Sequence, residues 1–186
     1  MSKALYLIGA PGSGKSTVMG RLIQALGLRP GPEVRVCREA TATQLLRGDR
    51  ELAWMLGRFR DKFPGTDALG MAASRYLREW IEDGGEMPPL VLGEGVRLAN
   101  VRFLLTLDVY RPLTVAYLEA PNGELQHRCI ARDGDLNATY KAGAATRALK
   151  LAEDLELLGI PVMRINTMAF TADQSADLLA EKVTER

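Results

Sequence analysis

The chain of 186 residues has little of what marks several large classes of protein. Its two cysteines, Cys37 and Cys129, form no Cys-x-x-Cys pair, so the sequence predicts neither a zinc site nor a disulfide framework. A formal net charge of +1 gives no bulk electrostatic reason for tight non-specific binding to nucleic acid. No apolar run approaches the roughly 20 residues of a membrane-spanning helix. We therefore expect a soluble protein of the reducing cytoplasm that does not bind membranes.

The composition is that of an ordinary globular protein, with 47% hydrophobic and 25% charged residues. The length fits a single α/β domain over residues 1–186. The apolar start of the chain resembles part of a signal peptide, but it continues directly into a glycine-rich loop that cleavage would destroy. We interpret residues 4–8 as a strand instead.

Short apolar runs alternate with segments of helical spacing, and this alternation predicts a parallel sheet. The predicted strands are 4–8, 34–37, 90–92, 114–118 and 161–165. The predicted helices are 15–26, 41–56, 67–83, 97–109, 124–132, 141–158 and 172–184. Two stretches interrupt the alternation, a helical insert at about 40–87 and a polar segment at about 119–141. Because inserts on a rigid sheet often carry substrate-binding residues, we expect the first to bind the acceptor and the second to form a lid.

The strongest motif is a complete GxxxxGK[ST] match that follows a predicted strand and opens a predicted helix. Such a loop binds ATP because its backbone N–H groups and the helix N-terminus converge on the phosphates. Lys15 adds a full positive charge near the β- and γ-phosphates, Ser16 is expected to ligate Mg²⁺, and Thr17 to support the turn. The predicted ATP-binding residues here are Gly9, Ala10, Pro11, Gly12, Ser13, Gly14, Lys15, Ser16 and Thr17.

A second acidic element follows the apolar run 90–92. Glu94 lies just beyond this predicted strand, at the edge where parallel sheets place residues that face ligands. It is a candidate ligand of Mg²⁺ and a candidate general base, although a solvated turn carboxylate remains an alternative. Arg97 follows closely and could clamp an acceptor phosphate through two hydrogen bonds, or could be a surface arginine.

Late arginines form a third element. Arg128 and Arg132 are four residues apart on a predicted helix, so both side chains leave the same face and could reach one anion. Arg147 follows on the next helix. Phosphoryl transfer needs positioned cations, so we expect Arg128 and Arg132 to be catalytic, with Arg128 also binding ATP. The alternative is a solvated helix face.

Together, the glycine loop, the Glu94-Gly95-x-Arg97 element, the helical insert and the arginine pair resemble the nucleoside monophosphate kinase branch of the P-loop kinases, over nearly the whole chain. The resemblance implies a three-layer α/β/α fold, a five-stranded parallel sheet of order 2-3-1-4-5, an acceptor-binding insert and a lid over ATP. The family's Asp-Gly-x-Pro-Arg element is partly matched at 94–97. Its Thr-Gly-Asp-x-x-Arg acceptor signature is absent, and only Arg47 matches its end.

The expected acceptor-binding residues are mostly arginines, because a phosphate acceptor needs placed cations. For Asp67, at the start of a predicted helix, capping and acceptor binding are equally favoured. The full set is Arg38, Arg58, Asp67, Arg97 and Arg147.

The leading hypothesis is a kinase that moves the γ-phosphate of Mg-ATP to a nucleoside or deoxynucleoside monophosphate. A rival is a kinase for a hydroxyl acceptor, such as a small metabolite, an antibiotic or a hydroxymethylated base in phage DNA, which would use Glu94 or Asp67 as a base. DNA is expected as a partner only in that case. A nucleotide-dependent switch or ATPase is a third alternative, and the expected oligomeric state is a monomer or a homodimer.

Overall fold

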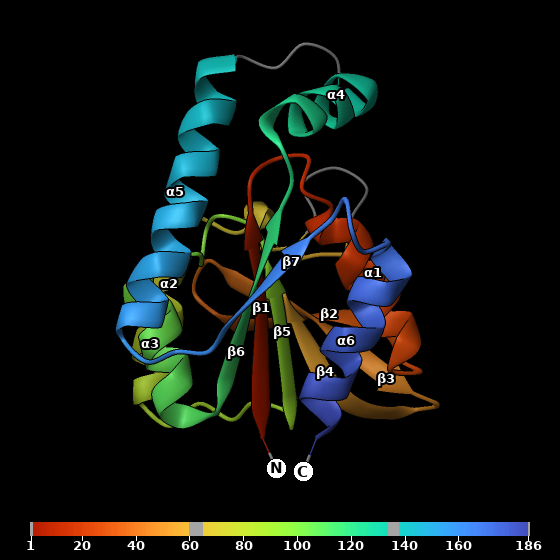
Figure 1. Cartoon of the computed structure of the whole chain (residues 1–186). Coiled ribbons are helices and arrows are strands. Elements are labelled where there is room, and N and C mark those ends of the chain that lie inside the picture. Colours follow the sequence, from red (N-terminus) through yellow and green to blue (C-terminus); the bar gives the residue numbers. More distant parts are fainter. Residues whose placement is uncertain (1, 60–64, 134–137, 186) are drawn as a thin grey trace.

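The computed structural model describes residues 2–59, 65–133 and 138–185. Its centre is a seven-stranded sheet of order β2-β3-β4-β5-β1-β6-β7 (Figure 1). The strands are β1 (Lys3–Gly9), β2 (Arg29–Cys37), β3 (Ala40–Arg47), β4 (Arg50–Leu56), β5 (Leu90–Glu94), β6 (Leu113–Glu119) and β7 (Val162–Asn166). The helices are α1 (Lys15–Ala25), the short 3₁₀ helix η1 (Thr66–Ala68), α2 (Ala73–Glu82), α3 (Val101–Tyr110), α4 (Asn122–Asp133), α5 (Ala138–Leu157) and α6 (Ala172–Thr184).

The sheet is mixed rather than wholly parallel. Strands β4, β5, β1, β6 and β7 pair in parallel, whereas β2 pairs antiparallel with β3 and β3 antiparallel with β4. The predicted five-stranded sheet of order 2-3-1-4-5 is therefore not matched. The segment predicted as its second strand, 34–37, lies in β2 at the antiparallel edge of the sheet.

The largest error of the sequence prediction is the helix at 41–56, where the structure has the hairpin of β3 and β4. Arg47 pairs with Arg50, so a two-residue loop, Gly48-Asp49, joins the two strands. Gly48 has φ 60°, a left-handed conformation that glycine adopts readily. A glycine followed by aspartate between two runs is a hairpin signal, and here it outweighs the helical spacing of the alanines and leucines.

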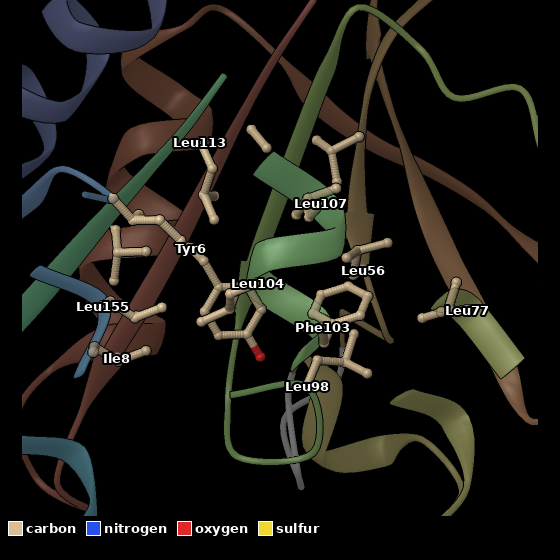
Figure 2. Packing of buried hydrophobic residues seen from close by; sticks show 14 of the residues in the cluster. Tyr6, Ile8, Leu56, Leu77, Leu98, Phe103, Leu104, Leu107, Leu113 and Leu155 are labelled. Atoms are coloured by element: carbon tan, nitrogen blue, oxygen red, sulfur yellow. The ribbon is translucent and has the colours of Figure 1, made fainter. Parts of the chain in front are cut away.

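Helices cover both faces of the sheet and divide the core into two clusters. Along β1, Leu5 and Leu7 face a cluster that includes residues of α1 and α6. Tyr6 and Ile8 face a cluster that includes residues of α2, α3 and α5, and Figure 2 shows Tyr6 there beside Leu104. This alternation buries every residue of β1 from Ala4 to Gly9, which places the end of the strand rigidly below the following loop.

The two ends of the described chain lie side by side, at the end of the sheet opposite the loop that follows β1 (Figure 1). Lys3 Nζ donates to the carbonyl oxygen of Lys182 at 3.0 Å and also to that of Glu185. Lys182 lies in the last turn of α6 and Glu185 is its C-cap residue, and a cation is favoured at this end of a helix. Within the described residues, no helix is long and apolar enough to cross a membrane.

Candidate active site

The GxxxxGK[ST] segment forms the connection between β1 and α1, as the sequence predicts. Gly12 and Gly14 have φ values of 83° and 89°, which favour glycine. A Cβ atom on Gly12 would lie 2.6 Å from the carbonyl oxygen of Leu125. The loop is thus packed directly against α4, and a side chain at position 12 would separate them.

Lys15 is the first residue of α1 and its side chain folds back over the loop. Its Nζ donates to the carbonyl oxygens of Gly9 at 2.9 Å and Ala10 at 3.0 Å. The ammonium group and the N-terminus of α1 therefore place positive charge at the same point. Of the neighbouring predicted ATP-binding residues, Ala10 and Ser13 are buried, Pro11 is half-buried and Thr17 is exposed.

Ser16 and Glu94 meet across the sheet edge, which brings the two predicted metal ligands together. Ser16 Oγ donates to Glu94 Oε1 at 3.0 Å, and Glu94 is only 2% exposed. The contact arises because β5 lies next to β1, with Glu94 paired in register with Leu7. A serine hydroxyl and a carboxylate are oxygen ligands suited to Mg²⁺.

The described residues contain no group of three or more His, Cys, Asp and Glu side chains that could hold a metal ion. A cation at Ser16 and Glu94 would therefore complete its shell with water and with phosphate oxygens. This is the usual arrangement for Mg²⁺, which keeps several waters and binds through one or two protein groups plus substrate phosphates. The two residues fit Mg²⁺ in a nucleotide complex.

Asp67 joins the insert to the loop after β5. It lies in the first turn of η1, and its Oδ1 accepts a hydrogen bond from the backbone N–H of Val96 at 2.6 Å. Its carboxylate thus caps a main-chain donor of another segment. Arg97, in the same loop, contacts the sulfur of Met71, and its buried Nε has no partner among the described residues.

Two of the predicted acceptor-binding arginines have partners elsewhere. Arg58 Nε lies 3.2 Å from Glu33 Oε2, in an ion pair beside the sheet edge. Arg38 lies over the ring of Tyr76 on α2, 5.1 Å from the ring centroid. Neither lines a pocket at the phosphate loop among the described residues. The structure therefore does not gather the predicted arginine set around one anion.

Two pockets flank the phosphate loop. We call the first the acceptor-side pocket, after the substrate that we propose for it below; its walls are largely apolar, with Lys15 and Arg147 as its cations. It is lined by Ile8, Gly9, Lys15, Gly95, Val96, Ala99, Ala144, Arg147, Ala148 and Leu151.

We call the second the donor-side pocket, in which hydroxyl groups and one arginine predominate. It is lined by Ser13, Gly14, Thr17, Val18, Arg128, Thr167, Phe170, Thr171, Ala172 and Ser175. Thr167 and Phe170 were not predicted from the sequence. They follow the carboxyl end of β7, so the rule that ligands bind beyond the ends of parallel strands could have found them.

Arg128 is held in place in the wall of the donor-side pocket. Its Nε donates to Glu124 Oε1 at 2.7 Å, one turn earlier on α4, and its Nη1 donates to Thr167 Oγ1 at 3.0 Å. The guanidinium thus links α4 to the loop after β7. The side chain of Arg132 lies outside the described part of the structure, as do residues 134–137 of the predicted lid.

Residues 1–156, which include both cations of the acceptor-side pocket, match the family model described as P-loop Nucleotide Kinase3. The comparison with curated proteins gives no match. Among solved structures, the unliganded crystal structure of a sugar kinase from Janibacter sp. aligns over 99% of this chain and 96% of its own, with a TM-score of 0.50 and 12% sequence identity. At that identity the similarity shows the fold alone.

Proposed function

Because the chain belongs to the P-loop Nucleotide Kinase3 family and is an ATP-dependent kinase, we propose that it transfers the γ-phosphate of Mg-ATP to a nucleoside or deoxynucleoside monophosphate. One observation carries the proposal. The phosphate loop lies between two pockets, with Ser13 and Gly14 in the wall of one and Lys15 in the wall of the other. A donor and an acceptor bound in these pockets would meet at Lys15.

The donor-side pocket suits the base and sugar of ATP. The triphosphate would follow the loop amides toward the N-terminus of α1, where the helix dipole favours negative charge. Phe170 is 41% exposed and offers a ring face on which a base can stack. Arg128 would contribute its charge without a large loss of conformational freedom, because its bonds to Glu124 and Thr167 already fix it.

The acceptor-side pocket suits a monophosphate. Its apolar walls, such as Val96 and Leu151, can cover a sugar or base, and Arg147 can bind a phosphate through two parallel hydrogen bonds. In the reaction, an oxygen of the acceptor phosphate attacks the γ-phosphorus, and the bond from this phosphorus to the β,γ-bridging oxygen breaks to release ADP. Lys15 would stabilise the charge that develops on the transferred group. Mg²⁺ on Ser16 and Glu94 would neutralise charge on the β- and γ-phosphates.

A second candidate is transfer to a hydroxyl group, and a specific observation favours it. Glu94 and Asp67 place two carboxylates around the loop after β5, and a Cβ atom on Gly95 would lie 2.8 Å from Asp67 Oδ1. A hydroxyl acceptor benefits from such a carboxylate as a general base. Among the described residues, moreover, the acceptor-side pocket has one arginine, Arg147, where a phosphate acceptor gains from several. This acceptor could be a small metabolite, an antibiotic or a hydroxymethylated base in DNA.

The test is ATP consumption with Mg²⁺ across nucleoside and deoxynucleoside monophosphates, hydroxylated metabolites and hydroxymethylated DNA, with each product identified by mass. We expect diphosphate formation from a monophosphate. A phosphate found only on a hydroxyl group would replace this proposal by the second candidate. ATP turnover that no acceptor changes would contradict both and favour an ATPase or switch.

A further inference from the structure

Tyr6 lies directly beneath the candidate active site, fully buried in the middle of β1. Its ring packs beside Leu98, Phe103 and Leu104 with its hydroxyl directed toward the loop that follows β5 (Figure 2). In register, Tyr6 pairs with Gly93 of β5. A Cβ atom on Gly93 would lie 2.6 Å from two ring carbons of Tyr6, so the absence of a side chain at position 93 makes room for the ring.

The Tyr6 hydroxyl makes two buried hydrogen bonds at the end of β5. It donates to the carbonyl oxygen of Gly95 at 2.9 Å and lies 3.0 Å from Thr66 Oγ1. A carbonyl can only accept, so the single Tyr6 proton is used on Gly95, and Thr66 must donate to Tyr6. Thr66 is itself 0% exposed. The hydroxyl therefore joins two segments that are separate in the sequence.

These two segments carry both carboxylates of the site. Gly95 follows Glu94, and Thr66 precedes Asp67, whose Oδ1 accepts from the N–H of Val96. The segments are also in close contact, since a Cβ atom on Gly65 would lie 2.8 Å from Glu94 Oε1. The Glu94 carboxylate thus lies against Gly65 on one side and accepts from Ser16 on the other.

We propose that Tyr6 is a positioning residue that holds the Glu94–Gly95 turn against the Thr66–Asp67 segment and so fixes the orientation of the Glu94 carboxylate toward Ser16. The inference rests on the proposed role of Glu94 at Mg-ATP. Without the hydroxyl, the Gly95 carbonyl and the Thr66 hydroxyl would be buried without this partner, and the turn would move to solvate them. A carboxylate misplaced by even a small distance loses much of its effect in phosphoryl transfer.

The protonation of Tyr6 agrees with this role. Burial raises the pKa of Tyr6 well above its ordinary value, and the nearby carboxylates of Glu94 and Asp67 raise it further, although the bond to Thr66 lowers it. The hydroxyl therefore stays a donor to Gly95 around neutral pH. We expect the contribution of Tyr6 to be independent of pH there.

The test compares Tyr6→Phe, Thr66→Val and Glu94→Gln, with Tyr117→Phe as a matched control. Tyr117 is a buried tyrosine of β6 in the same core cluster, outside this network. For Tyr6→Phe and Thr66→Val we expect kcat to fall roughly tenfold while the KM for ATP changes less than about threefold, as for an interaction that matters mainly in the transition state. Combined with Glu94→Gln, Tyr6→Phe should add almost no further loss, because the two act as a unit.

A second measurement does not depend on activity. Amide hydrogen exchange at Val96, whose N–H bonds to Asp67, should become about tenfold faster in Tyr6→Phe and remain unchanged in Tyr117→Phe. Unchanged exchange together with an unchanged kcat would overturn the inference, as would full additivity with Glu94→Gln. If Glu94→Gln alone kept the wild-type rate, the proposed role of Glu94 would fail, while the exchange data would still show whether Tyr6 holds the turn. Should Tyr6→Phe not fold, Thr66→Val removes the Tyr6–Thr66 bond from the other side and leaves the bond from Tyr6 to Gly95.

Discussion

The two pockets beside the phosphate loop differ in what lines them. The donor-side pocket is rich in hydroxyl groups, and its arginine, Arg128, is fixed by Glu124 and Thr167. The acceptor-side pocket is mainly apolar, and its arginine, Arg147, is exposed on α5. Fixed polar groups lower the entropic cost of binding a charged ligand, whereas apolar walls select by shape. If ATP and the acceptor bind as proposed, the donor side is thus organised before binding, and the acceptor side depends more on the fit of its ligand.

Lys15 lies in the wall of the acceptor-side pocket and directly follows Gly14, which lines the donor-side pocket, so its removal should have the largest effect. We expect Lys15→Ala to lower kcat roughly 10²- to 10³-fold, because it removes the preorganised positive charge that would stabilise the transferred phosphate. The measurement is steady-state kinetics, with folding checked by circular dichroism. Lys150→Ala is the control, as an exposed lysine on α5. Turnover like that of the wild type in Lys15→Ala would refute the mechanism.

Arg147→Ala should distinguish the two pockets, because it should change the KM for the acceptor and not the KM for ATP. We expect the KM for the acceptor to rise about tenfold or more, since a charge-assisted bond to a phosphate is lost. The KM for ATP should stay nearly constant. The matched control is Arg102→Ala, because Arg102 is an exposed arginine on α3. A change confined to ATP would assign Arg147 to the donor, and no change at all would favour the hydroxyl acceptor.

Arg128→Ala should give the opposite pattern with a smaller effect. Its side chain is about a third exposed (32%), so solvent screens its charge. We expect the KM for ATP to rise roughly three- to tenfold, with the KM for the acceptor unchanged, as the pocket loses one charged contact. Isothermal titration with a non-hydrolysable ATP analogue gives the same comparison without turnover. An equal rise in KM for ATP and for the acceptor would mean that Arg128 does not act on the donor side alone.

The positions of the phosphate loop and Glu94 could be predicted from the sequence much better than those of the arginines, for physical reasons. The phosphate loop follows from fixed spacing within eight residues, and Glu94 follows from the rule that parallel strands end at one edge. The positions of Arg38 and Arg58 depend on Tyr76 and Glu33, which local sequence patterns do not reveal. The hairpin of β3 and β4 has alanines and leucines at helical spacing, and the short Gly48-Asp49 turn is the sequence feature that favours strands there.

The same hairpin changes what surrounds the acceptor side. Antiparallel strands extend the sheet where a helical insert was expected, and the Thr66–Asp67 segment follows the hairpin and meets the end of β5. Backbone contacts, such as the bridge between Arg58 and Gly65, fix that approach. Such backbone contacts depend little on which side chains are present, so a single sequence gives little indication of them.

The pairing of Lys3 with the end of α6 has a practical consequence for engineering. Since both ends of the described chain lie together and far from the phosphate loop, a short linker could join them into a circular permutant. New ends could be opened at the exposed hairpin turn Gly48-Asp49, which lies outside both pockets. The order in which the strands are synthesised would change, while the phosphate loop and Glu94 would keep their places.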